Sequence, residues 1–204
     1  MIQPRALALP LLAACAAALV LGSAWSLLHE RIGDAERAAR AAIFVELLPR
    51  ARFDNSPGDD TIMVADPALL GYASERHAYI ARLDGRIEAL FLPLLAADGY
   101  AGAIELLVGI DRDGAITGVR VLAQHETPGM GAQIDPQHSN WLLQFVGRSL
   151  HNPQLQGWAV RRDGGEFDQL SGATVTSRAV TAALEHALQY AAANPGLFTG
   201  ERHE

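Results

Sequence analysis

The stretch "AGAIELLVGIDRDGAITGVRVLAQ", residues 101–124, contains two apolar runs separated by the polar turn "DRDG". Two apolar runs joined by a short turn rich in Asp and Gly are typical of a β-hairpin. The segment "HAYIARLDGRIEALFLPL", residues 77–94, repeats this pattern around Asp84-Gly85. A third segment, "GWAVRRDGGEFDQL" at 157–170, also has the pattern of a hairpin. The sequence therefore predicts three hairpins in an antiparallel sheet.

Helical patterns flank these hairpins. Residues 29–49, "HERIGDAERAARAAIFVELLP", predict a helix that ends at the closing proline, and residues 139–147, "SNWLLQFVG", predict a short helix capped by Ser139. Between residues 175 and 193 apolar or small side chains recur at helical spacing, and Asn-Pro-Gly at 194–196 ends that helix. Hairpins with segregated helices indicate an α+β fold: an antiparallel sheet with flanking helices.

The start of the chain is apolar over a length that fits a bilayer. Residues 6–28 carry no charge, and as a helix they would extend roughly 34 Å, against about 30 Å for a bilayer core. We therefore predict an N-terminal tail at 1–5 and a retained transmembrane helix at 6–28. Two alternatives stay open: a cleaved signal peptide, and a lipoprotein processed at the "LAAC" that ends at Cys15.

Composition excludes several classes of chemistry. Cys15 is the only cysteine, so the chain has no internal disulfide and no cysteine-based metal site. All 16 basic residues are arginine, which excludes a P-loop lysine, a Schiff base and a lysine general base. The histidines lack the spacing of metal ligands, so we predict no metal site. The formal net charge of −7 argues against nucleic acid as a partner.

Residues 167–180, "FDQLSGATVTSRAV", place several hydroxyl side chains where the last predicted helix begins. The first N–H groups of a helix lack backbone partners, and the helix dipole favours negative charge there. A phosphate group is therefore a natural ligand for this segment. The alternative is a helix that is simply capped by its Ser and Thr side chains. On the residues alone, both interpretations stay open.

"DQLSGAT", residues 168–174, matches the pattern on which a flavin transferase attaches FMN through a phosphoester bond. Together with residues 99–134 and 158–180, it resembles the G subunit of the Rnf electron transport complex. The same attachment motif occurs in the C subunit of the sodium-pumping NADH:quinone reductase. The predicted anchor and the chain length also resemble the Rnf protein. The resemblance implies an FMN-binding domain at 61–204 that follows a juxtamembrane helix and linker at 29–60.

The resemblance also implies roles for individual residues. Thr174, the last threonine of the motif, would carry FMN covalently. Asp168 would belong to the sequence that the transferase reads. The small and hydroxyl residues around Thr174 would surround the phosphate or ribityl chain, with simple helix capping as the alternative for the last two: Ser171, Gly172, Ala173, Thr176 and Ser177.

A second candidate segment is "QHETPGMG", residues 124–131. The resemblance implies that His125, Glu126 and Thr127 lie near the flavin and hydrogen-bond the edge of its ring. Such hydrogen bonds tune the reduction potential of a cofactor that carries the chemistry itself. Without the resemblance, the same segment is a solvated surface turn closed by Pro128-Gly129.

The function implied by the resemblance is electron transfer through FMN in a membrane complex, which couples electron flow between ferredoxin and NAD to ion movement. No side chain is expected to act as acid, base or nucleophile in turnover, so the chain alone is not expected to be a catalyst. Its expected partners are the other subunits, the flavin transferase and the membrane. The alternatives are the C subunit of the quinone reductase and a non-redox anchor or assembly protein.

Arginines near the predicted anchor conflict with the resemblance about orientation. Arg5 precedes the anchor whereas Arg31, Arg37 and Arg40 follow it, so the positive-inside rule places the folded domain in the cytoplasm. The resembling family has this domain on the periplasmic side of the bacterial inner membrane. We follow the resemblance and expect a single-pass inner-membrane protein with a periplasmic domain.

Overall fold

The structure is a computed structural model that describes Trp25 and residues 41–199. The predicted anchor at 6–28, apart from Trp25, and most of the predicted helix at 29–49 lie outside the described residues. Within the described part of the chain, no helix combines the length and the apolar character needed to cross a membrane. The chain divides into two compact units, Met1–Ala42 and Ile43–Glu204, and the second unit contains all the elements described below.

The centre of the second unit is a five-stranded antiparallel sheet whose strands follow one another in sequence order. The hairpins predicted at 77–94 and 101–124 are confirmed, and the sequence analysis missed only the short first strand. The strands are β1 (Thr61–Val64), β2 (Arg76–Leu83), β3 (Arg86–Ala96), β4 (Ile104–Asp111) and β5 (Ile116–Ala123).

Turn chemistry explains where the hairpins reverse. Asp84 and Gly85 both have positive φ angles, 51° and 77°, as the tight turn between β2 and β3 requires. Aspartate tolerates this conformation and glycine adopts it without steric cost. Between β4 and β5, the Asp111 carboxylate accepts hydrogen bonds from the N–H groups of Asp113 and Ala115 at 3.1 and 3.0 Å. Both turns are therefore stabilised locally.

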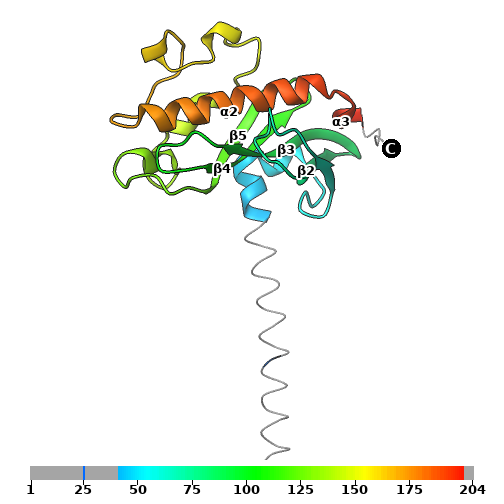
Figure 1. Cartoon of the computed structure of the whole chain (residues 1–204). Coiled ribbons are helices and arrows are strands. Elements are labelled where there is room, and N and C mark those ends of the chain that lie inside the picture. Colours follow the sequence, from blue (N-terminus) through cyan, green and yellow to red (C-terminus); the bar gives the residue numbers. More distant parts are fainter. Residues whose placement is uncertain (1–24, 26–40, 200–204) are drawn as a thin grey trace, which may run out of the picture. The chain divides into compact units, whose positions relative to one another are not determined.

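The long helix α2 (Thr174–Ala193) covers one face of the sheet, as Figure 1 shows. Alternate residues of β4 join the core beneath α2, namely Leu106, Val108 and Ile110, where they meet Leu184 and Val180 of the helix. This alternation follows from the period of two in a β-strand. The helix predicted at 175–193 is confirmed, and it begins at Thr174, the last residue of the segment 168–174 singled out in the sequence.

The opposite face of the sheet packs against residues 43–48, which are helical as far as Leu47. Figure 1 shows this segment in blue below the sheet. Gly118 of β5 permits the contact, because a Cβ atom there would lie 2.8 Å from the Cα atom of Leu47. Phe44 packs against Phe91 with ring centroids 5.0 Å apart. The compact unit thus begins ahead of the boundary that we predicted at residue 61.

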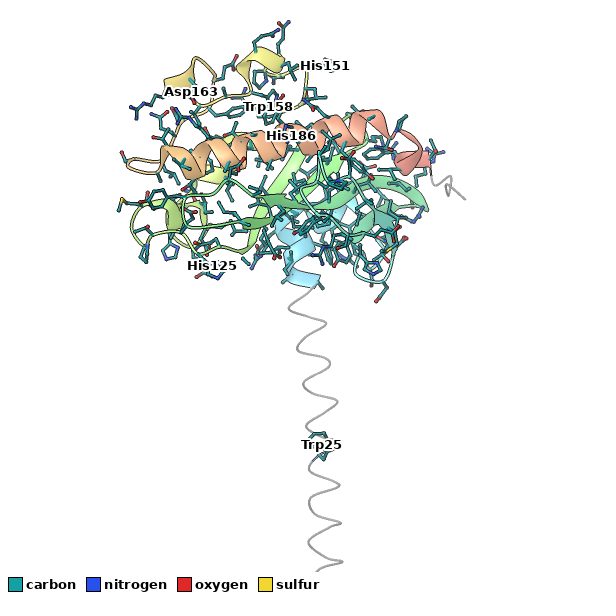
Figure 2. All side chains as sticks on the ribbon, viewed as in Figure 1. Trp25, His125, His151, Trp158, Asp163 and His186 are labelled. Atoms are coloured by element: carbon teal, nitrogen blue, oxygen red, sulfur yellow. The ribbon has the colours of Figure 1, made fainter. Side chains whose placement is uncertain are left out.

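The predicted third hairpin is wrong. Residues 157–170 form no strand pair and make only an isolated parallel bridge between Val160 and Phe167. The rings of Phe167 and Trp158 lie 4.8 Å apart, and Phe167 stacks on Phe145 at 4.6 Å. Burial of these large aromatic side chains in one cluster stabilises the segment without a backbone ladder. Figure 2 shows Trp158 and Asp163 on this irregular segment.

The remaining helices are short. The helix predicted at 139–147 is a 3-10 helix whose N-cap is Asn140 rather than Ser139, although the Ser139 hydroxyl accepts a hydrogen bond from the Trp141 N–H at 3.2 Å. The short helices are the 3-10 helices η1 (Arg50–Arg52), η2 (Gly131–Ile134), η3 (Trp141–Phe145), η4 (Leu155–Gly157) and η5 (Arg161–Asp163), and the α-helix α3 (Gly196–Thr199).

Candidate functional site

A cavity of about 480 Å³ lies at the N-terminal end of α2. Its volume is within the range of pockets that hold small molecules and cofactors. Three segments surround it: the start of α2, the loop that follows β5, and the turn that precedes β4. The lining residues are Tyr100, Glu126, Thr127, Met130, Gly131, Gly172, Ala173, Thr174, Val175 and Thr176.

The helix start at this cavity has no side-chain cap. The N-cap residue of α2 is Ala173, which has no hydroxyl or carboxylate to offer, and no side chain hydrogen-bonds there. The N–H groups of Thr174, Val175 and Thr176 have no hydrogen-bond acceptor among the described residues. The alternative of a simple hydroxyl-capped helix is therefore wrong. The first turn of α2 instead presents unpaired donors at the cavity.

The hydroxyl groups near the helix start have different partners. The Ser177 hydroxyl donates to the Ala173 carbonyl at 2.9 Å and accepts from the Leu170 N–H at 3.0 Å, so it fixes the turn before the helix. The Thr176 hydroxyl donates to the Glu126 carboxylate at 2.6 Å. The Thr174 hydroxyl makes no hydrogen bond with the described residues. Thr174 is half-buried and lines the cavity. Thr174 therefore offers a free hydroxyl group beside the unpaired N–H groups.

Gly172 shapes the edge of the cavity next to Thr174. Its φ angle is +75°, a left-handed conformation that side chains disfavour. A Cβ atom at Gly172 would also lie 3.3 Å from the Met130 sulfur, so a larger residue would press on the loop that follows β5. A glycine at this position lets the backbone turn into the helix while the loop stays close.

Charged side chains contribute little to the cavity. None of its lining residues is basic, and its one acidic residue, Glu126, is only 5% exposed. The nearest arginine along the helix, Arg178, forms a bidentate pair with Asp163 at 2.5 and 2.6 Å. This hydrogen bond lowers the pKa of Asp163 and raises the pKa of Arg178. An anion in the cavity would therefore be held by backbone N–H groups and the helix dipole.

Six of the ten residues predicted for the cofactor site line the cavity. Glu126 and Thr127 come from the loop that follows β5, while Thr174 and Thr176 come from the first turn of α2. Gly172 and Ala173 form the approach to the helix. Segments separated by about fifty residues in sequence thus meet in one place, as the Thr176–Glu126 hydrogen bond across 50 positions demonstrates.

The other four predicted residues do not line the cavity. Ser177 is fully buried and bonds the turn before the helix. Ser171 is exposed beside Gly172. The Asp168 carboxylate lies 3.1 Å from Arg161, and the Asp168 carbonyl accepts a hydrogen bond from the Trp141 indole at 2.6 Å. His125 is exposed, and Figure 2 shows it pointing away from α2.

Sequence reasoning missed four residues of the cavity. Tyr100, Met130 and Val175 are 71, 45 and 44% exposed, and they give the cavity an open apolar side. Gly131 is the fourth. Apolar side chains inside turns, in "GYAG" and "PGMG", were the signal that could have revealed Tyr100 and Met130. Such side chains have no core to enter at the surface, and they are available to a ligand.

Comparisons with known proteins identify the family of the domain that contains the cavity. Residues 99–189 match the family described as FMN-binding domain. A Pseudomonas aeruginosa protein, named as the G subunit of an ion-translocating oxidoreductase complex, is 49% identical over 164 residues, covering 80% of this chain and 77% of that protein. Proteins of the same name from Vibrio cholerae and Pseudoalteromonas atlantica are each 40% identical, over 87 and 81% of this chain and 84 and 77% of their own lengths.

These identities extend over most of both chains, far beyond the attachment motif. The family match at 99–189 also contains every residue that lines the cavity. The chain belongs to the family formed by the G subunits of Rnf ion-translocating oxidoreductase complexes.

Proposed function

We propose that this chain is an electron-transfer flavoprotein subunit of an ion-translocating oxidoreductase complex, with FMN bound in the cavity at the start of α2. The names of its relatives and its FMN-binding domain support this function. The observation that carries the proposal is the combination, in one cavity, of unpaired helix N–H groups and the free hydroxyl of Thr174.

We further propose that FMN is attached covalently to Thr174. A flavin transferase would form a bond between the Thr174 hydroxyl oxygen and the flavin phosphorus of a flavin dinucleotide. The pyrophosphate bond of that dinucleotide would break, its other half would leave as a nucleoside monophosphate, and the hydroxyl proton would pass to solvent. The unpaired N–H groups of the first helical turn would donate hydrogen bonds to the phosphate oxygens. Asp168 and Ser171, both exposed near Thr174, would belong to the surface that the transferase reads.

The absence of cationic side chains from the lining supports a covalent tether. Backbone N–H groups and a helix dipole hold a phosphate with modest energy, about 0.3–1 kcal/mol for the dipole at an exposed site. No arginine among the lining residues would add a charge-assisted hydrogen bond. A phosphoester bond to Thr174 would keep the flavin in place without such a cation.

FMN supplies the redox chemistry, because its ring accepts and releases electrons. The residues of this chain would bind and orient the ring and would take no part as acid, base or nucleophile. Tyr100, Met130 and Val175 offer the apolar surface that a flat aromatic ring requires. The Thr127 side chain and the donors near Thr174 would orient its polar parts.

The proposal includes the arrangement of the whole chain in a membrane. Residues 1–5 would form a tail, 6–28 a single transmembrane anchor, 29–60 a juxtamembrane helix and linker, and 61–204 the FMN-binding domain. Residues 43–60 of the linker segment already belong to the same compact unit as the domain. The domain would face the periplasm from the inner membrane and would contact other subunits of the complex. A reporter enzyme that is active only outside the cytoplasm, fused to the C-terminus, tests this orientation; activity of a cytoplasm-only reporter would contradict it.

The decisive experiment is mass spectrometry of the chain co-expressed with a flavin transferase. We expect the intact mass of the wild-type chain to increase by one FMN group, located on the peptide that contains residues 168–178. Thr174→Val should remain unmodified because it removes the acceptor oxygen and keeps a similar side-chain shape.

The matched control is Thr181→Val, which lies in the same helix. Thr181 is 1% exposed, its hydroxyl has no hydrogen-bond partner among the described residues, and it does not line the cavity. This variant should carry FMN as the wild type does. An unmodified wild-type chain, or a modified Thr174→Val chain, would overturn the proposed attachment.

A further inference from the structure

The three segments that surround the cavity meet at one buried carboxylate. Glu126 is 5% exposed, and its two oxygens have different partners. Oε1 accepts a hydrogen bond from the Ala101 N–H at 3.0 Å, and Oε2 accepts one from the Thr176 hydroxyl at 2.6 Å. The carboxylate therefore joins the turn that precedes β4, the loop that follows β5, and the first turn of α2.

Two glycines make room for this carboxylate. A Cβ atom at Gly131 would overlap Glu126 Oε2 and would lie 2.9 Å from the Thr176 hydroxyl oxygen. A Cβ atom at Gly99 would lie 3.0 Å from Glu126 Oε1. Backbone therefore approaches both oxygens closely, so the carboxylate is held in one orientation.

The carboxylate is held by neutral donors. Among the described residues it takes part in no ion pair, and its hydrogen bonds come from one backbone N–H and one hydroxyl. A carboxylate that is 5% exposed depends on its few donors, because leaving a buried polar group without a hydrogen bond costs free energy. The junction of the three segments is therefore sensitive to a single hydroxyl group, that of Thr176.

Each of the joined segments also supplies a wall of the cavity. Tyr100 precedes Ala101, Met130 lies in the same loop as Glu126, and Thr174 lies in the same helical turn as Thr176. We propose that Glu126 and Thr176 are positioning residues of the flavin site. Their hydrogen bond fixes the separation between Thr174, the attachment point, and the walls that border the ring. This inference rests on the proposed function, since it concerns how the attached flavin is held.

The first test uses the chain without flavin and follows hydrogen exchange of residues 99–102 by mass spectrometry. Thr176→Val removes the hydroxyl and keeps the shape, so we expect the Ala101 amide to exchange about tenfold faster. Thr176→Ser restores the hydroxyl and should restore slow exchange. Unchanged exchange in Thr176→Val would overturn the proposed junction.

The matched control for this test is Ser177→Ala. Ser177 is the neighbouring residue, it is fully buried, and its hydroxyl also makes two hydrogen bonds, but it bonds Leu170 and Ala173 rather than Glu126. The variant should lower the melting temperature while leaving exchange at residues 99–102 unchanged. Equal acceleration in both variants would show a general loosening of the helix start and would overturn the specific role.

The second test measures the fluorescence anisotropy of the flavin in the transferase-treated chain. Thr176→Val should still acquire FMN on Thr174, but with a ring that moves more freely, so anisotropy should fall below that of wild type and Ser177→Ala. Thr176→Ser should restore it. Wild-type anisotropy in Thr176→Val would overturn the positioning role, since a merely structural residue would alter stability without freeing the ring.

Failure of the proposed function has a separate signature. If the wild-type chain acquires no FMN mass, the proposed attachment is wrong and the positioning role fails with it. The exchange experiment still decides whether Glu126 joins the three segments, because it needs no flavin. If the wild type is loaded and only the anisotropy is unaffected by Thr176→Val, the attachment stands and the positioning role alone is overturned.

Discussion

The two ends of α2 are built differently. At the C-terminal end, the Asn194 N–H donates to the carbonyls of Tyr190 and Ala191, and the Asn194 side chain donates again to Tyr190 at 2.9 Å. At the N-terminal end, Ala173 occupies the cap position and the first N–H groups have no acceptor among the described residues. The last turn of the helix is therefore closed by hydrogen bonds from Asn194, whereas the first turn leaves its N–H groups unpaired beside the 480 Å³ cavity.

This difference explains the cluster of hydroxyls around Thr174. An alanine at the N-cap is less stabilising than serine or aspartate by about 1 kcal/mol. The neighbouring hydroxyls do not compensate, because Ser177 bonds the preceding turn and Thr176 bonds Glu126. Open donors at a helix start are the feature that an attached phosphate would satisfy.

The largest expected effect on stability comes from the middle of α2, between its two ends. Leu184 is fully buried against the sheet, so Leu184→Ala should lower the free energy of unfolding by about 3 kcal/mol. Chemical denaturation of flavin-loaded and unloaded chains should show the same loss in both. A much larger loss of unfolding free energy in the flavin-loaded chain would show that the middle of α2 also contributes to holding the flavin, and would contradict the distinction.

A smaller effect is expected at the turn into the helix. Gly172→Ala forces a side chain into a left-handed conformation and places its Cβ atom 3.3 Å from the Met130 sulfur. We expect a loss of about 1–2 kcal/mol in the free energy of unfolding and slower attachment of FMN. Gly114→Ala is the matched control, because Gly114 also has a positive φ of 74° but lies in the turn between β4 and β5. Its stability should fall similarly while attachment proceeds normally.

A side-chain cap added at the N-terminal end of α2 should make that end resemble the capped C-terminal end. Ala173→Ser introduces a cap, which should stabilise the unloaded chain by about 1 kcal/mol in thermal unfolding. The new hydroxyl oxygen would accept a hydrogen bond from an N–H group that would otherwise donate to the phosphate. Attachment of FMN should therefore become slower. Asn194→Ala at the other end should destabilise the helix by a similar amount and leave attachment unchanged. Faster attachment in Ala173→Ser would contradict the role given to the open donors.

The smallest effect concerns acid. The hydrogen bond from Arg178 lowers the pKa of Asp163 from its ordinary value of 3.8, so the ionised pair stabilises the folded state above that pH. The contribution should disappear as pH falls below 3.8 and through the lower pKa of the folded state. Because both groups are exposed, we expect only a slight change in melting temperature. Asp163→Asn should lack this part of the acid sensitivity; an identical acid profile would contradict the assignment.

The sequence predicted those parts of the fold that local chemistry determines. Asp84-Gly85 and the "DRDG" turn favour their reversals by backbone preference alone, and α2 shows a regular apolar face. The prediction of the third hairpin was wrong because its turn residues resemble those of a true hairpin. Burial of Trp158 and Phe167 instead stabilises an irregular segment. Local patterns carry no information about such a long-range aromatic cluster.

The candidate site was predicted only in part for the same reason. The motif at 168–174 located the start of α2, and resemblance pointed to residues 125–127. The contact between Glu126 and Thr176 spans 50 positions, so no local pattern reveals that these residues bond each other. Tyr100 and Met130 were missed because an exposed apolar side chain in a turn has no distinctive spacing.

The order of the strands bears on how the chain matures. Each strand pairs with its neighbour in sequence, so every sheet contact closes a short loop and can form early in folding. During synthesis β1 to β5 emerge before α2, which completes the cavity last. A modifying enzyme that requires the finished cavity would thus act only on fully folded chains, and the presence of flavin would report that folding had been completed.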